Sequence, residues 1–173
     1  IPRIGMLIAA STSVYSAWVE AFRQRLRELG YVEGKNIVIE YRYVEGKLER
    51  VSNLAAELVQ LKVDVIVTTG PGILAAKKAS TTMPIVFAAS SDPVGTGLVS
   101  SLAQPGGNIT GLSTMSPDLD GKRLELLKEA FPKVARVAFL WQSTSSTGNL
   151  SLTDMEAAAP AAVVPVDERR PAG

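Results

Sequence analysis

Three short runs of hydroxyl, glycine and carboxylate residues are the parts of the sequence best suited to hold a small ligand. They are residues 11–13 (STS), 68–71 (TTGP) and 90–93 (SSDP), and each follows an apolar segment and precedes a helix-like one. Small side chains let a ligand approach the backbone. The N–H groups at a helix start lack intrahelical partners and attract carboxylates or phosphates. The three runs therefore predict a site for a small polar ligand.

The charge in the third run favours one class of ligand. Asp92 can receive an ammonium group, so the runs together suit a zwitterion such as an amino acid better than a polyphosphate. Tyr15 opens the helix-like segment beside the first run and is a further possible contact. The candidate ligand-binding residues are Ser11, Thr12, Tyr15, Thr69, Gly70, Ser90, Ser91 and Asp92. Each run alone has a structural alternative, because Ser91 or Asp92 before Pro93 is also an ordinary helix N-cap.

The residue types that are missing narrow the chemistry. The sequence contains neither cysteine nor histidine. Thiol catalysis, disulfides and thiolate metal sites are therefore excluded, and the commonest general base and zinc ligand is lacking. We expect a binding protein with no catalytic residue, metal or cofactor. An enzyme built on carboxylates and hydroxyls is the less favoured alternative, since a fold by itself does not determine function.

Composition agrees with a globular binding protein. The 173 residues are 46% hydrophobic and 20% charged, with a formal net charge of +1. Such a chain can bury a core. It has no block of like charges of the kind that binds nucleic acid. Its apolar runs are shorter than the ~20 residues that span a bilayer.

The candidate runs need a scaffold that brings them together, and the sequence pattern predicts one. Short apolar segments, typical of strands, lie at residues 3–10, 37–43, 63–69, 84–89, 108–114 and 135–141. Helical segments lie between them at residues 14–29, 48–62, 70–80, 92–104 and 116–132. This alternation predicts an α/β fold, a doubly wound parallel sheet with right-handed crossovers. In such sheets ligands bind beyond the carboxyl ends of the strands, where the three runs lie.

The pattern changes after residue 141. Residues 142–152 (QSTSSTGNLSL) read as a polar loop, and the remainder predicts one short helix, broken near Pro160, and one short strand at residues 162–166. We therefore expect a first α/β lobe at residues 1–115. Residues 116–173 are expected to form a crossover helix, a strand and the truncated start of a second lobe.

Residues 3–141 also resemble a known family. The combination of "ELGYVEGKNI", "DPVGTGLV" and "PGGNITGLS" is similar to ABC-transporter substrate-binding proteins whose better-known members resemble tryptophan- or phenylalanine-binding periplasmic proteins. The resemblance implies a type I periplasmic binding protein fold, with two lobes around a ligand. The resemblance implies that the family's strand-end turns map onto all the candidate residues chosen above except Tyr15. A complete second lobe would need on the order of 100 further residues.

The resemblance also implies a role and a location. It predicts reversible capture of an amino-acid-like solute, an extracytoplasmic or periplasmic location, and delivery to the membrane permease of an ABC transporter. Ile1 is not a start methionine, which fits a removed secretory or lipoprotein leader and fits equally a sequence that starts within a longer chain. Two alternatives stay open: an effector-binding regulatory or sensory domain of the same fold, and a homodimer formed through the short C-terminal part.

Overall fold

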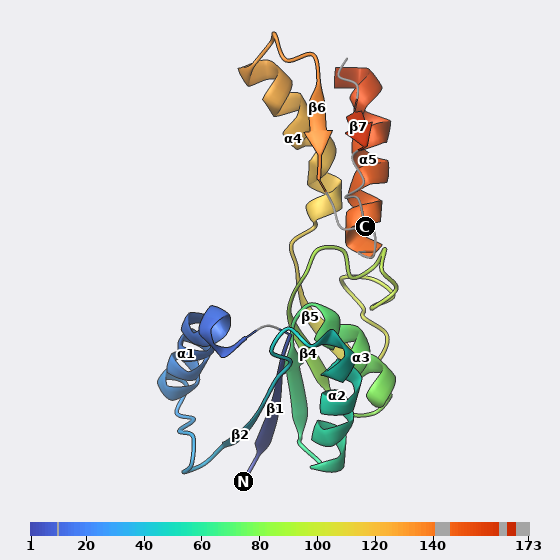
Figure 1. Ribbon diagram of the computed structural model, residues 1–173. Coiled ribbons are helices and arrows are strands. Elements are labelled where there is room, and N and C mark those ends of the chain that lie inside the picture. The colour runs from blue at the N-terminus through green and yellow to red at the C-terminus, as the bar shows by residue number, and fades with distance from the viewer. Residues whose placement is uncertain (10, 141–145, 163–165, 169–173) are drawn as a thin grey trace. The chain divides into compact units, whose positions relative to one another are not determined.

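The protein is described from a computed structural model (Figure 1), which describes residues 1–9, 11–140, 146–162 and 166–168. The chain groups into two compact units. Unit 1 comprises residues 1–90 and 98–112, and unit 2 comprises residues 91–97 and 113–173. The boundary of the predicted lobes, after residue 115, stays a prediction. No helix among the described residues has the length and apolar character needed to cross a membrane.

Unit 1 is built on a five-stranded sheet of order β2-β1-β3-β4-β5 (Figure 1). Its strands are β1 (Arg3–Ile8), β2 (Val38–Tyr43), β3 (Val65–Thr68), β4 (Ile85–Ser90) and β5 (Ile109–Ser113). β1 pairs in parallel with β2 and with β3, and β3 pairs in parallel with β4. The predicted parallel α/β sheet is therefore confirmed, because the apolar segments of the sequence are its strands.

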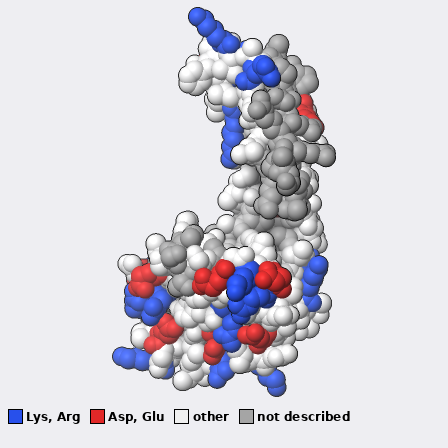
Figure 2. Space-filling model, in the orientation of Figure 1, with Lys and Arg blue, Asp and Glu red and all other residues white. Residues whose placement is uncertain are grey.

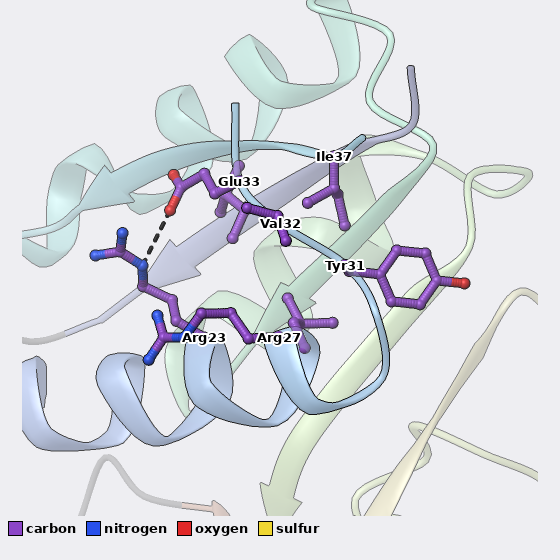
Figure 3. Close-up of a pocket in the computed structure, with 8 residues that line it drawn as sticks. Arg23, Arg27, Tyr31, Val32, Glu33 and Ile37 are labelled. Carbon is purple, nitrogen blue, oxygen red and sulfur yellow. Dashed lines mark ion pairs between the residues drawn. The ribbon is translucent and has the colours of Figure 1, made fainter. Parts of the chain in front are cut away.

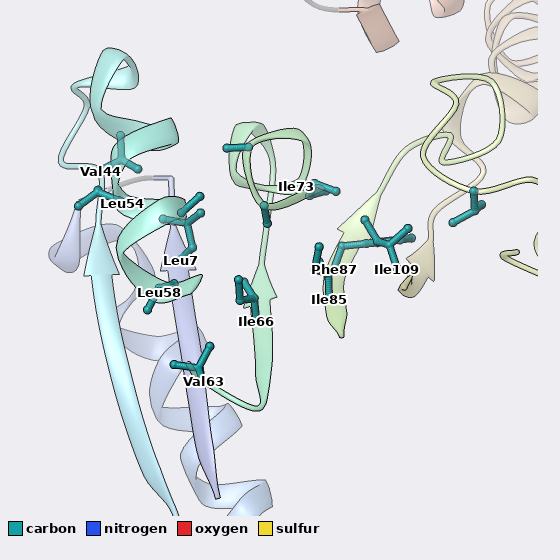
Figure 4. Close-up of a cluster of buried hydrophobic side chains, with 14 residues drawn as sticks. Leu7, Val44, Leu54, Leu58, Val63, Ile66, Ile73, Ile85, Phe87 and Ile109 are labelled. Carbon is teal, nitrogen blue, oxygen red and sulfur yellow. The ribbon is translucent and has the colours of Figure 1, made fainter. Parts of the chain in front are cut away.

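Helices cover both faces of this sheet. They are α1 (Thr12–Glu28), the short η1 (Leu48–Arg50), α2 (Val51–Gln60) and α3 (Pro71–Ala79). Figure 1 shows α1 on one side of the sheet and α2 and α3 on the other. Each strand contributes side chains to the apolar layers on both faces of the sheet, since successive side chains point to opposite faces. In β1, for example, Met6 and Ile8 pack under α1, whereas Leu7 lies in the cluster under α2 and α3 (Figure 4).

The two layers are covered to different extents. On the α2–α3 side Leu7, Ile66 and Phe87 are at most 2% exposed. On the α1 side the covering helix lies over β1 and β2, and the neighbouring strands are more open. Val86 of β4 is 37% exposed and Leu112 of β5 is 70% exposed. Parallel sheets are normally covered on both faces, so this part of the α1 side is unusually accessible.

The predicted helix at residues 92–104 is wrong. The Gly95 N–H donates to Asp92 Oδ1 at 2.7 Å, and the Thr96 N–H donates to the Asp92 carbonyl at 3.1 Å. The chain thus makes one turn and then leaves it at Gly97, whose φ of 69° is left-handed. Glycines at 95 and 97 favour this outcome, because glycine weakens a helix and readily adopts the left-handed conformation that ends one.

Unit 2 contains α4 (Ser116–Ala130), β6 (Val137–Phe139), α5 (Ser146–Ala162) and β7 (Val166–Glu168). β6 and β7 pair in parallel, and the buried Leu124 of α4 packs with Val137 and with Ala158 of α5. Ala158 also approaches Gly121, since a β-carbon at that position would lie 3.2 Å from it. Unit 2 therefore has a small apolar core between its helices and its strand pair.

Two expectations for the C-terminal part are corrected by α5 and β7. Residues 146–152, predicted as loop, are helical, and α5 continues past Pro160. The hydroxyl of Thr153 donates to the Asn149 carbonyl at 3.1 Å, so a polar side chain is satisfied within the helix instead of opposing it. The strand predicted at 162–166 overlaps β7 at Val166 only, because Ala162 ends α5; residues 163–165 lie outside the described residues.

We predict that Gly111→Ala destabilises unit 1. A β-carbon at Gly111 would overlap the carbonyl oxygen and ring of Phe87 in the neighbouring strand, so β5 must shift. Overpacking of this kind costs about 1–3 kcal/mol in the free energy of unfolding, measurable by urea denaturation. Gly107→Ala is the matched control, because a β-carbon there meets nothing within 4 Å. Equal stability of the two variants would contradict this packing.

Candidate ligand-binding site

Parallel pairing brings three strand ends of unit 1 to one edge of the sheet. Leu7 lies beside Thr68, and Thr68 lies beside Phe87, in neighbouring strands. Each strand ends within three residues of this row. The residues that follow, among them Ser11 and Thr69, therefore start from the same edge. This arrangement is the one expected for a ligand site in a parallel sheet.

Tyr15 and Thr69 line one hollow between α1 and the sheet. Its wall is mostly apolar, and its full lining is Met6, Leu7, Ile8, Tyr15, Trp18, Val19, Phe22, Val67, Thr68, Thr69 and Ala88. Two threonines of this wall differ in their bonding. The Thr68 hydroxyl donates to the Leu7 carbonyl at 2.9 Å. The Thr69 Oγ1 is buried and has no hydrogen-bond partner among the described residues.

The Thr69 hydroxyl is therefore a buried polar group that lacks a hydrogen-bond partner among the described residues. A buried hydroxyl without a partner costs free energy, and most such groups in native proteins are bonded. The two threonines lie on either side of the strand end, since Thr68 is the last residue of β3 and Thr69 follows it. Thr68 points to the α2–α3 side, where a β-carbon on Gly72 would overlap its hydroxyl. Thr69 lines the hollow beside α1.

The start of α3 does not have the free N–H groups that the sequence predicts at a helix start. The Gly72 N–H donates to the Thr69 carbonyl, and the Ile73 N–H donates to the Gly70 carbonyl, both at 3.1 Å. These first amides are thus already bonded to the chain itself. Gly70 has φ 51° and ψ −130°, which favours glycine. Its role in the turn is conformational, since a β-carbon there would meet nothing within 4 Å.

The start of α1 carries the partial positive charge of a helix N-terminus. Ser11 is its N-cap residue and has extended backbone angles, but its side chain makes no capping hydrogen bond. The first turn contains no acidic residue. A helix start of this kind favours a negatively charged group nearby. The side chain of Thr12, the other candidate here, lies outside the described residues.

The third run divides between the two units. Ser90 ends β4 in unit 1, whereas Ser91 and Asp92 belong to unit 2. The Ser91 carbonyl accepts the Ser116 N–H at 3.1 Å, and Asp92 caps its own turn through Oδ1. Asp92 thus has a structural task already, as the N-cap alternative anticipated. Its role toward a ligand stays a prediction.

Sequence reasoning did not select Trp18. It lies in the lining of the hollow, and it is 74% exposed although it is the largest apolar side chain of α1. The spacing of Tyr15, Trp18 and Phe22, three and four residues apart, places them on adjoining parts of one helix surface. That spacing was the available signal, but an aromatic at helical spacing is ordinarily a core residue.

A second hollow lies elsewhere on unit 1 and contains none of the candidate residues. It is lined by Arg23, Leu26, Arg27, Tyr31, Val32, Glu33, Ile37 and Ile39. In Figure 3 the Arg23 guanidinium points to the Glu33 carboxylate, with 3.0 Å between Nε and Oε2. Arg27 is paired with Glu20 at 2.7 Å. Because these charges are compensated, the hollow has no excess positive charge to attract an anion.

The visible surface shows the same balance of charge. Figure 2 shows acidic and basic side chains interspersed over one face of the molecule, without a large area of one sign. Arg25 and Glu28 form one exposed pair of opposite charge, at 2.8 Å. It agrees with a net charge of +1.

Comparison with known proteins identifies the family. The family model described as "ABC transporter substrate binding protein" matches residues 3–164. The chain belongs to this family. This substrate-binding protein is 31% identical over 138 residues to the tyrosine-binding protein of Clostridioides difficile (strain R20291), a match that covers 79% of the chain and 39% of that protein. The substrate-binding proteins of this family are extracytoplasmic, and the predicted resemblance is confirmed.

Solved structures extend the match. The substrate-binding protein superposes with a TM-score of 0.84 and 28% identity on an ABC domain from Streptococcus pneumoniae in complex with L-Trp, covering 96% of the chain and 56% of that structure. It superposes with a TM-score of 0.83 and 30% identity on a conserved domain protein from Vibrio cholerae, covering 95% and 55%. A Thermotoga maritima leucine-binding protein, at 15% identity and a TM-score of 0.74, supports the fold alone.

These matches define the fold and its extent. The fold is that of the type I periplasmic binding proteins, as predicted. The chain spans about half the length of the solved relatives and 39% of the curated one. The predicted incomplete second lobe fits this coverage.

Tyr41, which packs under α1 beside the second hollow, predicts a pH dependence of stability. Burial, together with the nearby Glu33 carboxylate, raises the pKa of Tyr41 from 10.0 to about 12. A raised folded-state pKa stabilises the protein below the unfolded pKa, and that contribution is lost as the pH rises through the folded value. Between pH 10.0 and about 12 the unfolding free energy of the wild type should therefore fall relative to Tyr41→Phe. Parallel pH profiles in denaturant titrations would contradict this.

Proposed function

We propose that this substrate-binding protein captures an aromatic amino acid reversibly as the solute-binding component of an ABC uptake system. The observation that carries the proposal is the buried, unpartnered hydroxyl of Thr69 in a hollow bordered by aromatic side chains. Two relatives support the ligand class, since one is named for tyrosine and another holds L-Trp. Delivery to a membrane permease is proposed from the family; pairing of two copies through the C-terminal part stays a prediction.

The residues around the hollow suggest which part of such a ligand each of them contacts. Tyr15, Trp18 and Phe22 present aromatic surface to it, and aromatic rings stack on one another favourably. The ligand's ring is expected against these residues, with one of its polar groups bonded to the Thr69 hydroxyl. The positive end of α1 at Ser11 favours the ligand carboxylate. Asp92 belongs to unit 2, and its contact with an ammonium group stays a separate prediction, made because a carboxylate–ammonium hydrogen bond is among the stronger ones.

Binding by itself accounts for these features. None of the proposed contacts breaks a bond, and the family consists of substrate-binding proteins. Affinity in such sites comes from enclosing most of the ligand's surface. Calorimetry with L-tryptophan, L-tyrosine and L-phenylalanine tests the proposal directly on the full chain. Absence of binding to all three would reject aromatic amino acids as its ligands.

Thr69→Val should weaken binding without unfolding the protein. Valine has the shape of threonine but cannot form the hydrogen bond, so affinity should fall by about 1 kcal/mol, roughly fivefold. The melting temperature without ligand should be unchanged or higher, because the buried unpartnered hydroxyl is removed. Thr81→Val, at an exposed position before β4, is the matched control. Affinity of Thr69→Val equal to that of the control would remove Thr69 from the site.

Asp92→Asn tests the ammonium contact separately from the turn. Asparagine keeps an oxygen that accepts the Gly95 N–H but loses the charge, so the turn should persist. Affinity for L-phenylalanine should fall by about 1.5–3 kcal/mol, the range for a hydrogen bond to a charged group. Affinity for 3-phenylpropionate, which lacks the amino group, should not change. An equal loss for both compounds would argue for a structural role of Asp92 alone.

A further inference from the structure

β2 is an outermost strand of the five-stranded sheet, and one of its sides faces no other described strand. The N–H groups of Val38 and Val44 donate to the carbonyls of Pro2 and Ile8, each at 2.9 Å, at the two ends of the β1–β2 ladder. In a strand the backbone groups alternate in direction. The backbone N–H and C=O groups of Ile39, Tyr41 and Tyr43 therefore point away from β1. Such an edge is a template for pairing with another strand.

Arg42 lies across this edge. Its Nη1 donates to the Tyr41 carbonyl at 2.9 Å, and that carbonyl is one of the outward-pointing groups. Its Nε is bonded to the Glu57 carboxylate of α2 at 2.9 Å, and Nη1 lies 4.0 Å from Glu40. The Arg42 side chain is only 25% exposed. The central acceptor of the edge is thus occupied by a side chain that α2 holds in place.

We propose that the β2 edge is a latent pairing surface for a second copy of this chain, and that Arg42 keeps it closed. In an antiparallel pair centred on Tyr41, the Tyr41 N–H of each copy would donate to the Tyr41 carbonyl of the other. Arg42 occupies that carbonyl, so pairing requires Arg42 to leave it. Charged side chains on edge strands are a common device against such pairing.

The sequence of β2 identifies a second copy as the partner. In this register Ile39 faces Tyr43 on the α1 side of the sheet, a β-branched–aromatic pair of the kind that stabilises sheets. On the other side Glu40 of each copy faces residue 42 of the other, so an Arg42 released from Glu57 would meet an opposite charge. The strand is therefore complementary to itself in shape and in charge.

Analytical ultracentrifugation tests this on the full chain. Glu57→Gln, which releases Arg42, and Arg42→Thr, which removes it, should each tighten self-association at least about tenfold over the wild type. The weight-average mass should rise from 18.3 kDa toward twice that value. Arg25→Thr and Glu28→Gln are matched controls, because they break a comparable pair on α1. Variants of Arg42 and Glu57 that associate no more than these controls would overturn the proposal.

A second substitution tests that the association uses this edge. The Tyr43 N–H points outward, so Tyr43→Pro costs no ladder hydrogen bond but blocks edge pairing. Added to Arg42→Thr, it should restore the association of the wild type; association that persists would overturn the proposal. Hydrogen exchange gives an independent reading if the double variant unfolds. In Arg42→Thr the amides of Ile39, Tyr41 and Tyr43 should become protected as concentration rises, and unchanged exchange would also overturn it.

Discussion

Parallel pairing of β1 with β3 is the constraint on which the rest of unit 1 depends. Leu7 and Ile66, both 0% exposed, anchor these strands in the layer under α2 and α3. A slip of one residue would turn every side chain of a strand to the opposite face, so burial on both faces sets the register. Because the strands run in the same direction, Ser11 and Thr69 then follow neighbouring strand ends. The candidate site is a consequence of this pairing.

The unequal covering of the sheet creates the candidate hollow. α1 lies over β1 and β2, which leaves a space beside it over β3 and β4. Trp18 borders that space instead of entering the core, as its 74% exposure shows. An apolar hollow bordered by exposed aromatic surface is typical of ligand sites. The position of a single helix thus accounts for both the exposed tryptophan and the hollow.

Three polar side chains at the turns and edges form hydrogen bonds with the backbone, and this distinguishes them from Thr69. Asp92 accepts a hydrogen bond from the Gly95 N–H, and Arg42 donates one to the Tyr41 carbonyl. The Asn108 amide donates to the carbonyls of Ser80 and Met83. Each side chain is explained by the fold it stabilises. Thr69 Oγ1 is buried without such a bond. Its environment, more than its residue type, makes it the strongest candidate for contact with a ligand.

The sequence by itself determined the strands of unit 1, most of its helices, the parallel sheet and the family, because apolar periodicity and motif combinations are local properties of the chain. Local patterns misjudged residues 92–104 and the start of α5, where glycine conformation and hydrogen bonds within the helix decided the outcome. Only the tertiary structure shows that Thr68 and Thr69 differ in hydrogen bonding and surroundings. Two adjacent threonines look alike in sequence, but Thr68 ends β3 and its hydroxyl donates to the Leu7 carbonyl, whereas Thr69 lies beyond the strand and lines the hollow beside Trp18.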